Sequence, residues 1–190
     1  MPRVHRWWLV GVSCMALVAT ACGDGDRETT APTAPPPTAV VSSGTQPEGF
    51  DLVAARVTAA DGEVCDLCVW LADTPDARAR GLMGVTDLGP AQAMAFLYPS
   101  VTTTSFWMYN TPMPLSIAYF DAAGVYLDSY DMQPCAANPC TSYPTAPRFT
   151  IAVEVPQGGL PDLLVAPGST FELLAAPCGE PARDPTRPPG

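Results

Sequence analysis

Residues 149–155 read FTIAVEV and alternate between large apolar side chains and smaller or polar ones. Side chains in a β-strand point to opposite faces with a period of two, so this stretch predicts a half-buried strand. Further strands are expected at residues 50–59, 64–72, 93–98, 105–109, 115–120, 125–132 and 170–174, with a hairpin turn at 121–124 and a short helix or turn at 156–164.

The region around residues 88–120 contains no charged residue, which at first suggests a membrane span. Four prolines and a Thr-Thr-Thr-Ser run interrupt it, and this favours buried strands joined by tight turns. One helix is expected after Thr74, with Pro75 at its first position, Asp76 in its first turn and Gly81 at its end. The pattern predicts a mainly β fold, a sandwich or jelly-roll-like barrel of short strands with one or two short helices.

The composition of the 190-residue chain excludes several kinds of chemistry. Its nine basic residues are all arginine, its one histidine is His5, and its formal net charge is −10. Without the first segment, the chain has no histidine base, histidine metal ligand or lysine for a Schiff base. The strong negative charge also disfavours a nucleic-acid partner.

Residues 1–21 have the features of an export signal, with a positive start at Arg3, His5 and Arg6 and an apolar run that follows. Its end, VATAC at 18–22, resembles the bacterial lipoprotein signal. That resemblance implies cleavage before Cys22 and acylation of its thiol, which would anchor the chain to the lipid bilayer on the extracytoplasmic side of the cell membrane or envelope. The alternatives are an ordinary cleaved signal and an uncleaved anchor.

Three segments are expected after the leader. Residues 22–49 form a lipidated cysteine and a Pro/Thr/Ala-rich linker of polyproline character, which holds the domain away from the membrane. Residues 50–178 form the β domain. Residues 179–190 form a proline-rich, disordered tail.

Five cysteines remain once Cys14 leaves with the signal and Cys22 is acylated. In an oxidising compartment we expect a local Cys135–Cys140 disulfide and a pairing of Cys178 with Cys65 or Cys68, of which Cys68 is preferred. One cysteine is then left over, and the partner of Cys65 is not assigned. The spacing of residues 65–68 also occurs in thiol redox motifs, but no neighbouring cation is expected to stabilise a thiolate there.

Four blocks of sequence together resemble the domain of unknown function 192 family: LADTPDARARGLMG at 71–84, FWMYNTPMPL at 106–115, AYFDAAG at 118–124 and VEVPQGG at 153–159. The resemblance covers residues 68–174. It implies a small, mostly β domain that is often exported and has no established activity. It also implies Lys, Asp and Gly at positions where this chain has Tyr109, Ser116 and Ala93, so part of any charged site is absent here.

The candidate ligand-binding residues are Arg78, Arg80, Trp107, Asn110 and Glu154. The two arginines fit either an anion-binding fork or a salt bridge from one of them to Glu154. Trp107 fits either an aromatic platform or a covered strand face, and Asn110 fits a turn cap. No metal or cofactor is expected, since the methionines suit core packing better than a Cu(I) site.

Three functions remain open. The first is a non-catalytic domain that binds a small polar, anionic or glycan ligand, or an envelope partner. The second is a hydrolase with a carboxylate-based site in the same cleft, for which Asp73, Asp121 and Glu154 are candidates. The third is a structural envelope module. The lack of histidine and lysine in the mature chain favours the first and third over an enzyme.

Replacing Cys22 with Ser tests the lipid anchor. Serine cannot form the thioether to the lipid, so the Cys22→Ser chain should move from the membrane fraction to the soluble fraction on cell fractionation. Continued membrane association would contradict the anchor.

Overall fold

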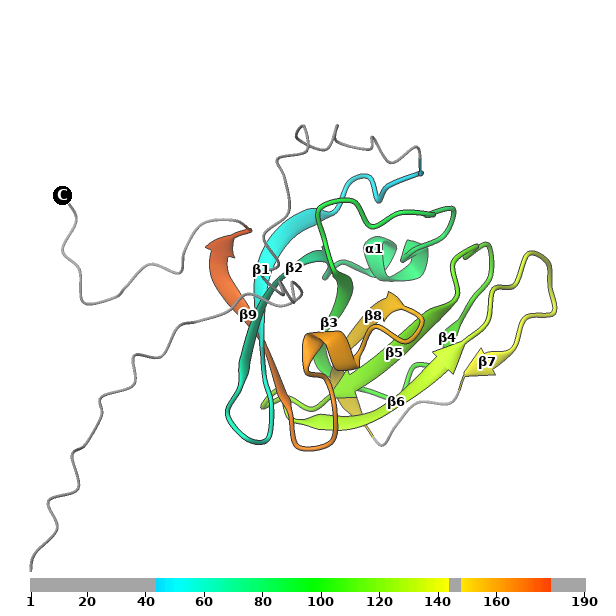
Figure 1. Ribbon diagram of the computed structural model, residues 1–190. Coiled ribbons are helices and arrows are strands. Elements are labelled where there is room, and N and C mark those ends of the chain that lie inside the picture. Colours follow the sequence, from blue (N-terminus) through cyan, green and yellow to red (C-terminus); the bar gives the residue numbers. More distant parts are fainter. Residues whose placement is uncertain (1–43, 144–147, 179–190) are drawn as a thin grey trace, which may run out of the picture.

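The chain folds into a large mixed β-sheet that curls strongly around a hydrophobic interior (Figure 1). The computed structural model describes residues 44–143 and 148–178, so the expected leader (1–21), most of the linker (22–49) and the tail (179–190) lie outside the described residues. The elements are β1 (Asp51–Thr58), β2 (Val64–Ala72), α1 (Pro75–Arg80), β3 (Ala93–Thr102), β4 (Phe106–Trp107), β5 (Leu115–Phe120), β6 (Tyr126–Met132), β7 (Ser142–Tyr143), β8 (Phe149–Pro156), the 3₁₀ helix η1 (Pro161–Leu163) and β9 (Thr170–Pro177). Within the described ranges, no helix has the length and apolar character needed to cross a bilayer.

Seven strands form the large sheet in the order β6-β5-β8-β3-β2-β1-β9, and β4 pairs with β7 in a separate two-stranded sheet. Neighbours in the large sheet are antiparallel except β2 and β3, which run parallel. A parallel pair needs a long crossover, and α1 with the loop that follows it supplies this connection. The prediction of a mainly β fold with one or two short helices is therefore confirmed.

The two edges of the large sheet approach each other without closing a barrel. Val125, just before β6, forms an isolated bridge with Thr170 at the start of β9. The backbone N–H of Phe171 donates to the carbonyl of Gly124 at 2.8 Å. A side chain at Gly124, whose φ is +77°, would collide with this strand, so glycine is required at the junction.

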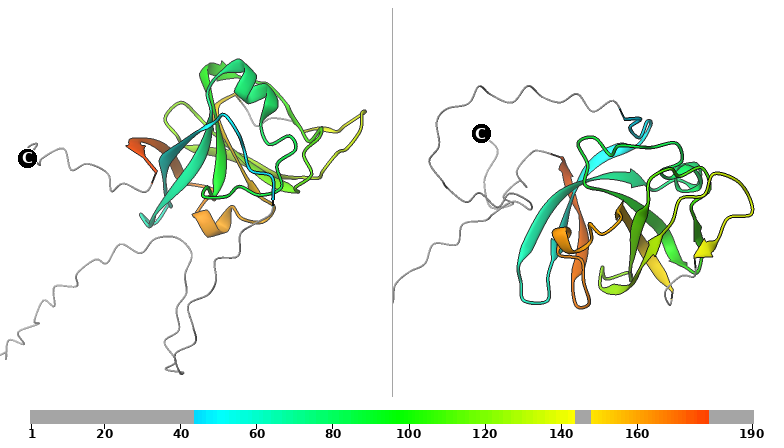
Figure 2. Two further views of the ribbon diagram at one scale, coloured as in Figure 1. Left: turned by 90° about the horizontal axis from the view of Figure 1, so that it is seen from above. Right: turned by 45° about the vertical axis from the view of Figure 1, so that its right-hand side comes forward.

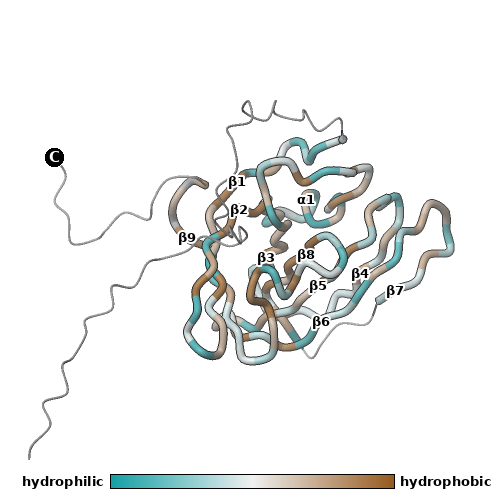
Figure 3. Tube along the Cα trace, viewed as in Figure 1, coloured by the Kyte–Doolittle hydropathy of each residue, from teal (hydrophilic) through white to brown (hydrophobic). Residues whose placement is uncertain are grey.

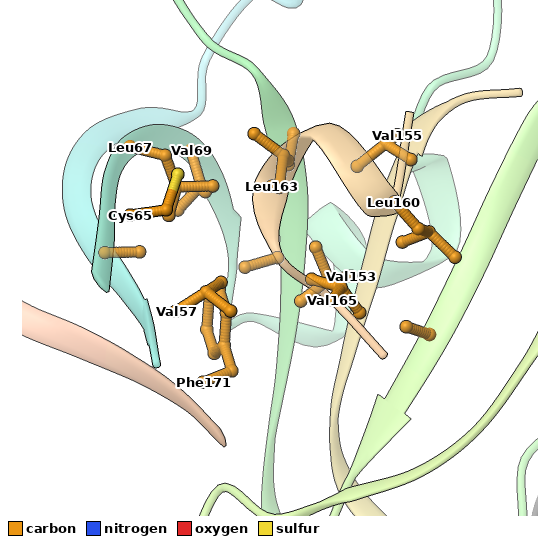
Figure 4. Close-up of a cluster of buried hydrophobic side chains, with 14 of the residues drawn as sticks. Val57, Cys65, Leu67, Val69, Val153, Val155, Leu160, Leu163, Val165 and Phe171 are labelled. Atoms are coloured by element: carbon orange, nitrogen blue, oxygen red, sulfur yellow. The ribbon is translucent and has the colours of Figure 1, made fainter. Parts of the chain in front are cut away.

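The sheet is covered on both faces, which creates two hydrophobic clusters. The inner core lies on the concave side under η1 and is drawn in Figure 4; its members include Val57, Leu67, Val69, Ala95, Val153, Val155, Leu163 and Phe171. The outer core lies under α1 and the loop after it; its members include Leu82, Leu88, Met94, Phe96, Phe106, Ile117, Tyr119 and Phe149. Figure 2 shows α1 and η1 on opposite sides of the sheet, and Figure 3 shows the apolar residues concentrated along the strands.

Strand β8 corrects the sequence prediction. The alternation at residues 149–155 predicts one exposed face, but six of these seven residues are buried and only Ile151 is partly exposed. Neighbours β3 and β5 flank the strand, and the outer core covers the face that holds Thr150, Ala152 and Glu154. The small or polar side chains of β8 therefore form a second buried face of this strand, and one of them is the carboxyl-bearing side chain of Glu154.

Helix α1 begins and ends where its sequence predicts. The hydroxyl of Thr74 accepts a hydrogen bond from the backbone N–H of Ala77 at 3.2 Å, and Pro75 is the first helical residue. Gly81 ends the helix with a φ of +48°, and a β-carbon there would lie only 3.2 Å from the ring of Phe96. Because Gly81 lies so close to Phe96, the last turn of the helix, with Arg78 and Arg80, packs against the outer face of the sheet.

Both disulfides expected from the sequence are present. Cys68 bonds to Cys178 with a Cα–Cα distance of 5.5 Å, and Cys135 bonds to Cys140 with a Cα–Cα distance of 5.8 Å. Cys65 is fully buried and belongs to the inner core, whereas Cys68 points to the opposite face of β2. This geometry rules out a redox disulfide between Cys65 and Cys68.

The two disulfides should differ in their contribution to stability, because they close loops of very different length. The Cys68–Cys178 bond spans 110 residues and the Cys135–Cys140 bond spans five. The chain-entropy model gives losses of about 5 and about 2 kcal/mol in the free energy of unfolding when each pair is replaced by serine. Urea denaturation of the two double-serine variants measures this, and equal losses would contradict it.

Candidate functional site

A pocket of about 340 Å³ opens on the outer face of the sheet, between the end of α1 and the strands beneath it. Its walls come from α1 and the turn after it, from β3, and from β4 with the residues just before β4. Polar or aromatic lining residues are Arg78, Arg80, Phe96, Tyr98, Thr104, Ser105, Phe106, Trp107, Thr111 and Glu154. Four of the five residues predicted from the sequence are thus brought to one cavity.

Glu154 contributes a buried carboxyl group to this pocket. It lies on β8 between Met94 of β3 and Ile117 of β5, and only 4% of its surface is exposed. Among the described residues, no hydrogen bond or ion pair reaches its carboxyl group. Burial raises the pKa of Glu154 to about 8, since the charged form loses its hydration. At neutral pH this carboxyl group is therefore mostly protonated.

Arg78 does not form the predicted ion pair with Glu154. Its Nη1 donates to the backbone carbonyls of Asp73 and, at 2.8 Å, Leu97, and its guanidinium lies 4.8 Å from the ring centroid of Tyr98. These contacts hold α1 against β3. The ion pair seen in the described ranges is Arg56–Asp66, on the other half of the sheet.

Arg80 does not pair with Glu154 either. It is exposed, and its guanidinium lies 4.3 Å from the ring centroid of Phe50, with a long 3.5 Å contact to the carbonyl of Gly49. The expectation of a salt bridge between helix and sheet is wrong because both guanidinium groups find carbonyls and aromatic rings nearer the surface, while Glu154 is recessed on a central strand.

Trp107 forms part of the rim of the pocket. The strand alternation holds, since Phe106 and Met108 are buried while Trp107 is 48% exposed. Its ring lies 5.3 Å from the ring of Tyr109, with 31° between their planes. The covered-face alternative for this strand is therefore excluded, since Trp107 is exposed and its neighbour Tyr109 is partly exposed.

Asn110 lies in a neighbouring hollow instead. It has a φ of +54° and lines an open cavity of about 570 Å³ together with Pro112, Pro134 and Cys135. The two cavities share Met83 and Thr111 in their walls. Asn110 therefore lies beside the Glu154 pocket, in a left-handed turn conformation that asparagine tolerates well.

Tyr98 is a pocket residue that sequence reasoning missed. Burial raises its pKa; the charge of Arg78 lowers it and the charge of Glu154 raises it. Its ring is thus within electrostatic range of both groups. The buried hydroxyls of Tyr119 and Thr150 lie on the same face of the sheet and have no hydrogen-bond partner within the described residues. No spacing in the sequence indicates that these side chains lie near one another, because they come from three strands.

The acids proposed for hydrolysis are not assembled. Asp121 accepts hydrogen bonds from the backbone N–H groups of Ala123 and Val125, at 2.8 and 2.9 Å, as a turn residue does. Asp73 precedes the helix cap, and neither aspartate lines the pocket. Among the described residues that line this cavity, Glu154 is the one that bears a carboxyl group, so these residues do not supply the pair of carboxyl groups that glycoside hydrolysis requires.

Ser116 is a buried polar residue of β5 that holds a carboxylate of the neighbouring strand. Its buried hydroxyl donates to Asp131 at 2.6 Å and accepts from the backbone N–H of Gly158 at 2.9 Å. Hydrogen bonds from Ser116 and then from Gln157 lower the pKa of Asp131. The carboxylate in this part of the sheet is therefore that of Asp131 on β6, which pairs with Ser116 on β5.

The described residues thus form a small β domain, a curled mixed sheet with a polar pocket beneath a short crossover helix. The model of family DUF192, described as "Uncharacterized ACR, COG1430", matches residues 56–173, and the chain belongs to this family. A crystal structure of a protein of unknown function from Novosphingobium aromaticivorans DSM 12444 is similar, with 27% identity and a TM-score of 0.59, over 70% of this chain and 94% of that one.

A second crystal structure, of a candidate transcription regulator from Sinorhizobium meliloti 1021, has 25% identity and a TM-score of 0.58. The similarity covers 65% of the present chain and 95% of the Sinorhizobium chain. No curated protein matches the sequence. The comparisons therefore establish the family and support the fold.

The buried carboxyl group predicts a pH dependence of stability. The folded state keeps the proton of Glu154 up to about pH 8, whereas the unfolded chain releases it near its ordinary value of 4.5. The free energy of unfolding should therefore fall as pH rises between these values, by up to about 1.4 kcal/mol per pH unit.

Glu154→Gln, which mimics the protonated acid, should remove this slope and stabilise the protein at pH 8. Urea denaturation between pH 5 and 9 measures the effect. Glu63→Gln, at an exposed position in the β1–β2 turn, is the control and should keep the slope because Glu154 is intact. An unchanged slope in Glu154→Gln would contradict the burial argument.

Proposed function

We propose that this chain is a lipid-anchored extracytoplasmic protein whose β domain binds a small polar ligand, anionic or glycan, in the Glu154 pocket. The observation that carries the proposal is the unpartnered carboxyl of Glu154, which is 96% buried yet lines a cavity. Burying a polar group without a hydrogen bond costs free energy, on the order of 1–3 kcal/mol. A ligand that supplies the missing hydrogen bond would recover part of this free energy.

The distribution of charge supports a polar and anionic ligand. The chain has a net charge of −10, but two of the four arginines in the described ranges, Arg78 and Arg80, line this one pocket. Arg56, by contrast, is paired with Asp66. The cavity therefore combines two cationic side chains in a strongly acidic chain, and the exposed ring of Trp107 offers a flat apolar contact beside them.

The proposed anchor would tether the domain to a membrane through the linker expected at residues 22–49. The residues between Cys22 and Gly44, if they are extended as polyproline, would span up to roughly 65 Å. That length would let the domain sample solutes well away from the bilayer surface. In the Cys22→Ser experiment, Cys14→Ser is the matched control, because Cys14 lies in the expected leader and its loss should leave membrane association unchanged.

Thermal-shift measurements on the full chain in mild detergent test the binding function, with a panel of sugars and organic anions. A ligand at 100 times its Kd stabilises the native state by about 2.7 kcal/mol, which raises Tm by several degrees. Trp107→Ala and Glu154→Leu should abolish the shift, whereas Val64→Ala, at an exposed apolar position outside the pocket, should keep it.

Shifts that are equal in the wild type and in both pocket variants would contradict binding at this site. The absence of any shift across the panel would instead favour the structural envelope module.

A further inference from the structure

The pocket is polarised along its depth. Arg80 and Trp107 lie exposed at its mouth, and Glu154 lies buried at its inner end. The two ends are separate, because neither arginine forms an ion pair with Glu154. Tyr98, whose pKa is raised mainly by burial, also senses the opposing charges of Arg78 and Glu154, and its ring packs against the guanidinium of Arg78. A ligand that fills the cavity must therefore offer different chemistry to its two ends.

The outer end offers hydrogen-bond donors. Arg78 uses Nη1 for its carbonyl contacts, and its Nε and Nη2 make no hydrogen bond among the described residues. Among the described residues, the one hydrogen bond of Arg80 is the long contact from its Nη2 to the carbonyl of Gly49, and its guanidinium also lies over the ring of Phe50. A guanidinium with two adjacent free N–H groups matches the two oxygens of a carboxylate, so this end suits a ligand carboxylate.

The inner end suits hydroxyl groups. The carboxyl of Glu154 is mostly protonated at neutral pH and ionises above it, so its partner must both donate and accept hydrogen bonds. A hydroxyl group does both, whereas a second carboxylate would be repelled once Glu154 ionises. The lining also contains the hydroxyls of Thr104, Ser105 and Thr111, which can bond further ligand hydroxyls.

Size and the aromatic rim complete the description of the ligand. The volume of this pocket is about 340 Å³. Pockets for small molecules run from about 300 to 1,000 Å³, so this one is small and suits a ligand with a single ring. The half-exposed ring of Trp107 provides a surface on which the apolar face of such a ring can stack.

We infer that the pocket binds an acidic sugar: a hydroxylated ring whose carboxylate is held by Arg80 at the mouth, whose hydroxyls bond to Glu154 and whose face packs on Trp107. This inference rests on the proposed function, and it adds the class and the orientation of the ligand.

Isothermal titration calorimetry on the full chain tests the inference with matched pairs of probes. Glucuronate and galacturonate carry the carboxylate, and glucose and galactose lack it. We expect at least one of the acids to bind at least tenfold more tightly than its neutral parent. Benzoate has a ring and a carboxylate but no hydroxyls, and it should bind at least tenfold more weakly than that acid.

Two arginine variants locate the carboxylate. Arg80→Gln should reduce the preference for the acid over its parent severalfold, whereas Arg148→Gln, at an exposed position outside the pocket, should leave it intact. Equal affinities for acid and parent would overturn the carboxylate assignment, and equal affinities for the acid and benzoate would overturn the hydroxyl assignment.

Failure of all the sugar acids to bind would overturn the inference as a whole. If another ligand from the thermal-shift panel still bound in a Trp107-dependent manner, the proposed binding function would stand and only the ligand class would be wrong.

Discussion

The burial of the Glu154 carboxyl is the constraint on which the outer half of this domain depends. Strand β8 lies between β3 and β5 and is covered on both faces, so its side chains are buried except those of Ile151 and Pro156. A carboxyl group there must lose its charge, find a partner or face a cavity. Glu154 faces a cavity, and the cover formed by α1 and β4 leaves space above it. The same cover that excludes water thus also creates the pocket.

The arrangement of the arginines follows from this geometry. Arg78 and Arg80 are brought to the pocket by a six-residue helix whose ending at Gly81 is set by close contact with Phe96. Their guanidinium groups are held by carbonyl groups and aromatic rings rather than by Glu154. Cationic and carboxyl groups therefore line one cavity without neutralising each other, which leaves both available to a bound molecule.

Local patterns in the sequence predicted the local structure well. Thr74, Pro75 and Gly81 defined the helix because capping and backbone strain act within a few residues. The Cys135–Cys140 pair was predictable from its short loop. The sequence blocks that resemble DUF192 also indicated the correct family, which the match over residues 56–173 establishes.

Long-range arrangements were predicted less well. The alternation in β8 indicated one buried face, but only the fold reveals that a second layer covers Thr150 and Glu154. The expected salt bridge from Arg78 or Arg80 to Glu154 is not formed, because the signs of the charges do not show that Glu154 is buried more deeply than either arginine. Tyr98 was missed because it comes to line the same pocket as Glu154 only through the pairing of β3 with β8.

The pKa of Glu154 is the quantity that tests this account most directly. Selective ¹³C labelling of glutamate side chains, with Glu154→Gln to assign the resonance, would allow the carboxyl carbon to be followed by NMR from pH 4 to 10. The account predicts a midpoint of about 8, as expected for a buried carboxyl without a charged partner. A midpoint at or below the ordinary value of 4.5 would mean that Glu154 is solvated or paired with an arginine, and would contradict it.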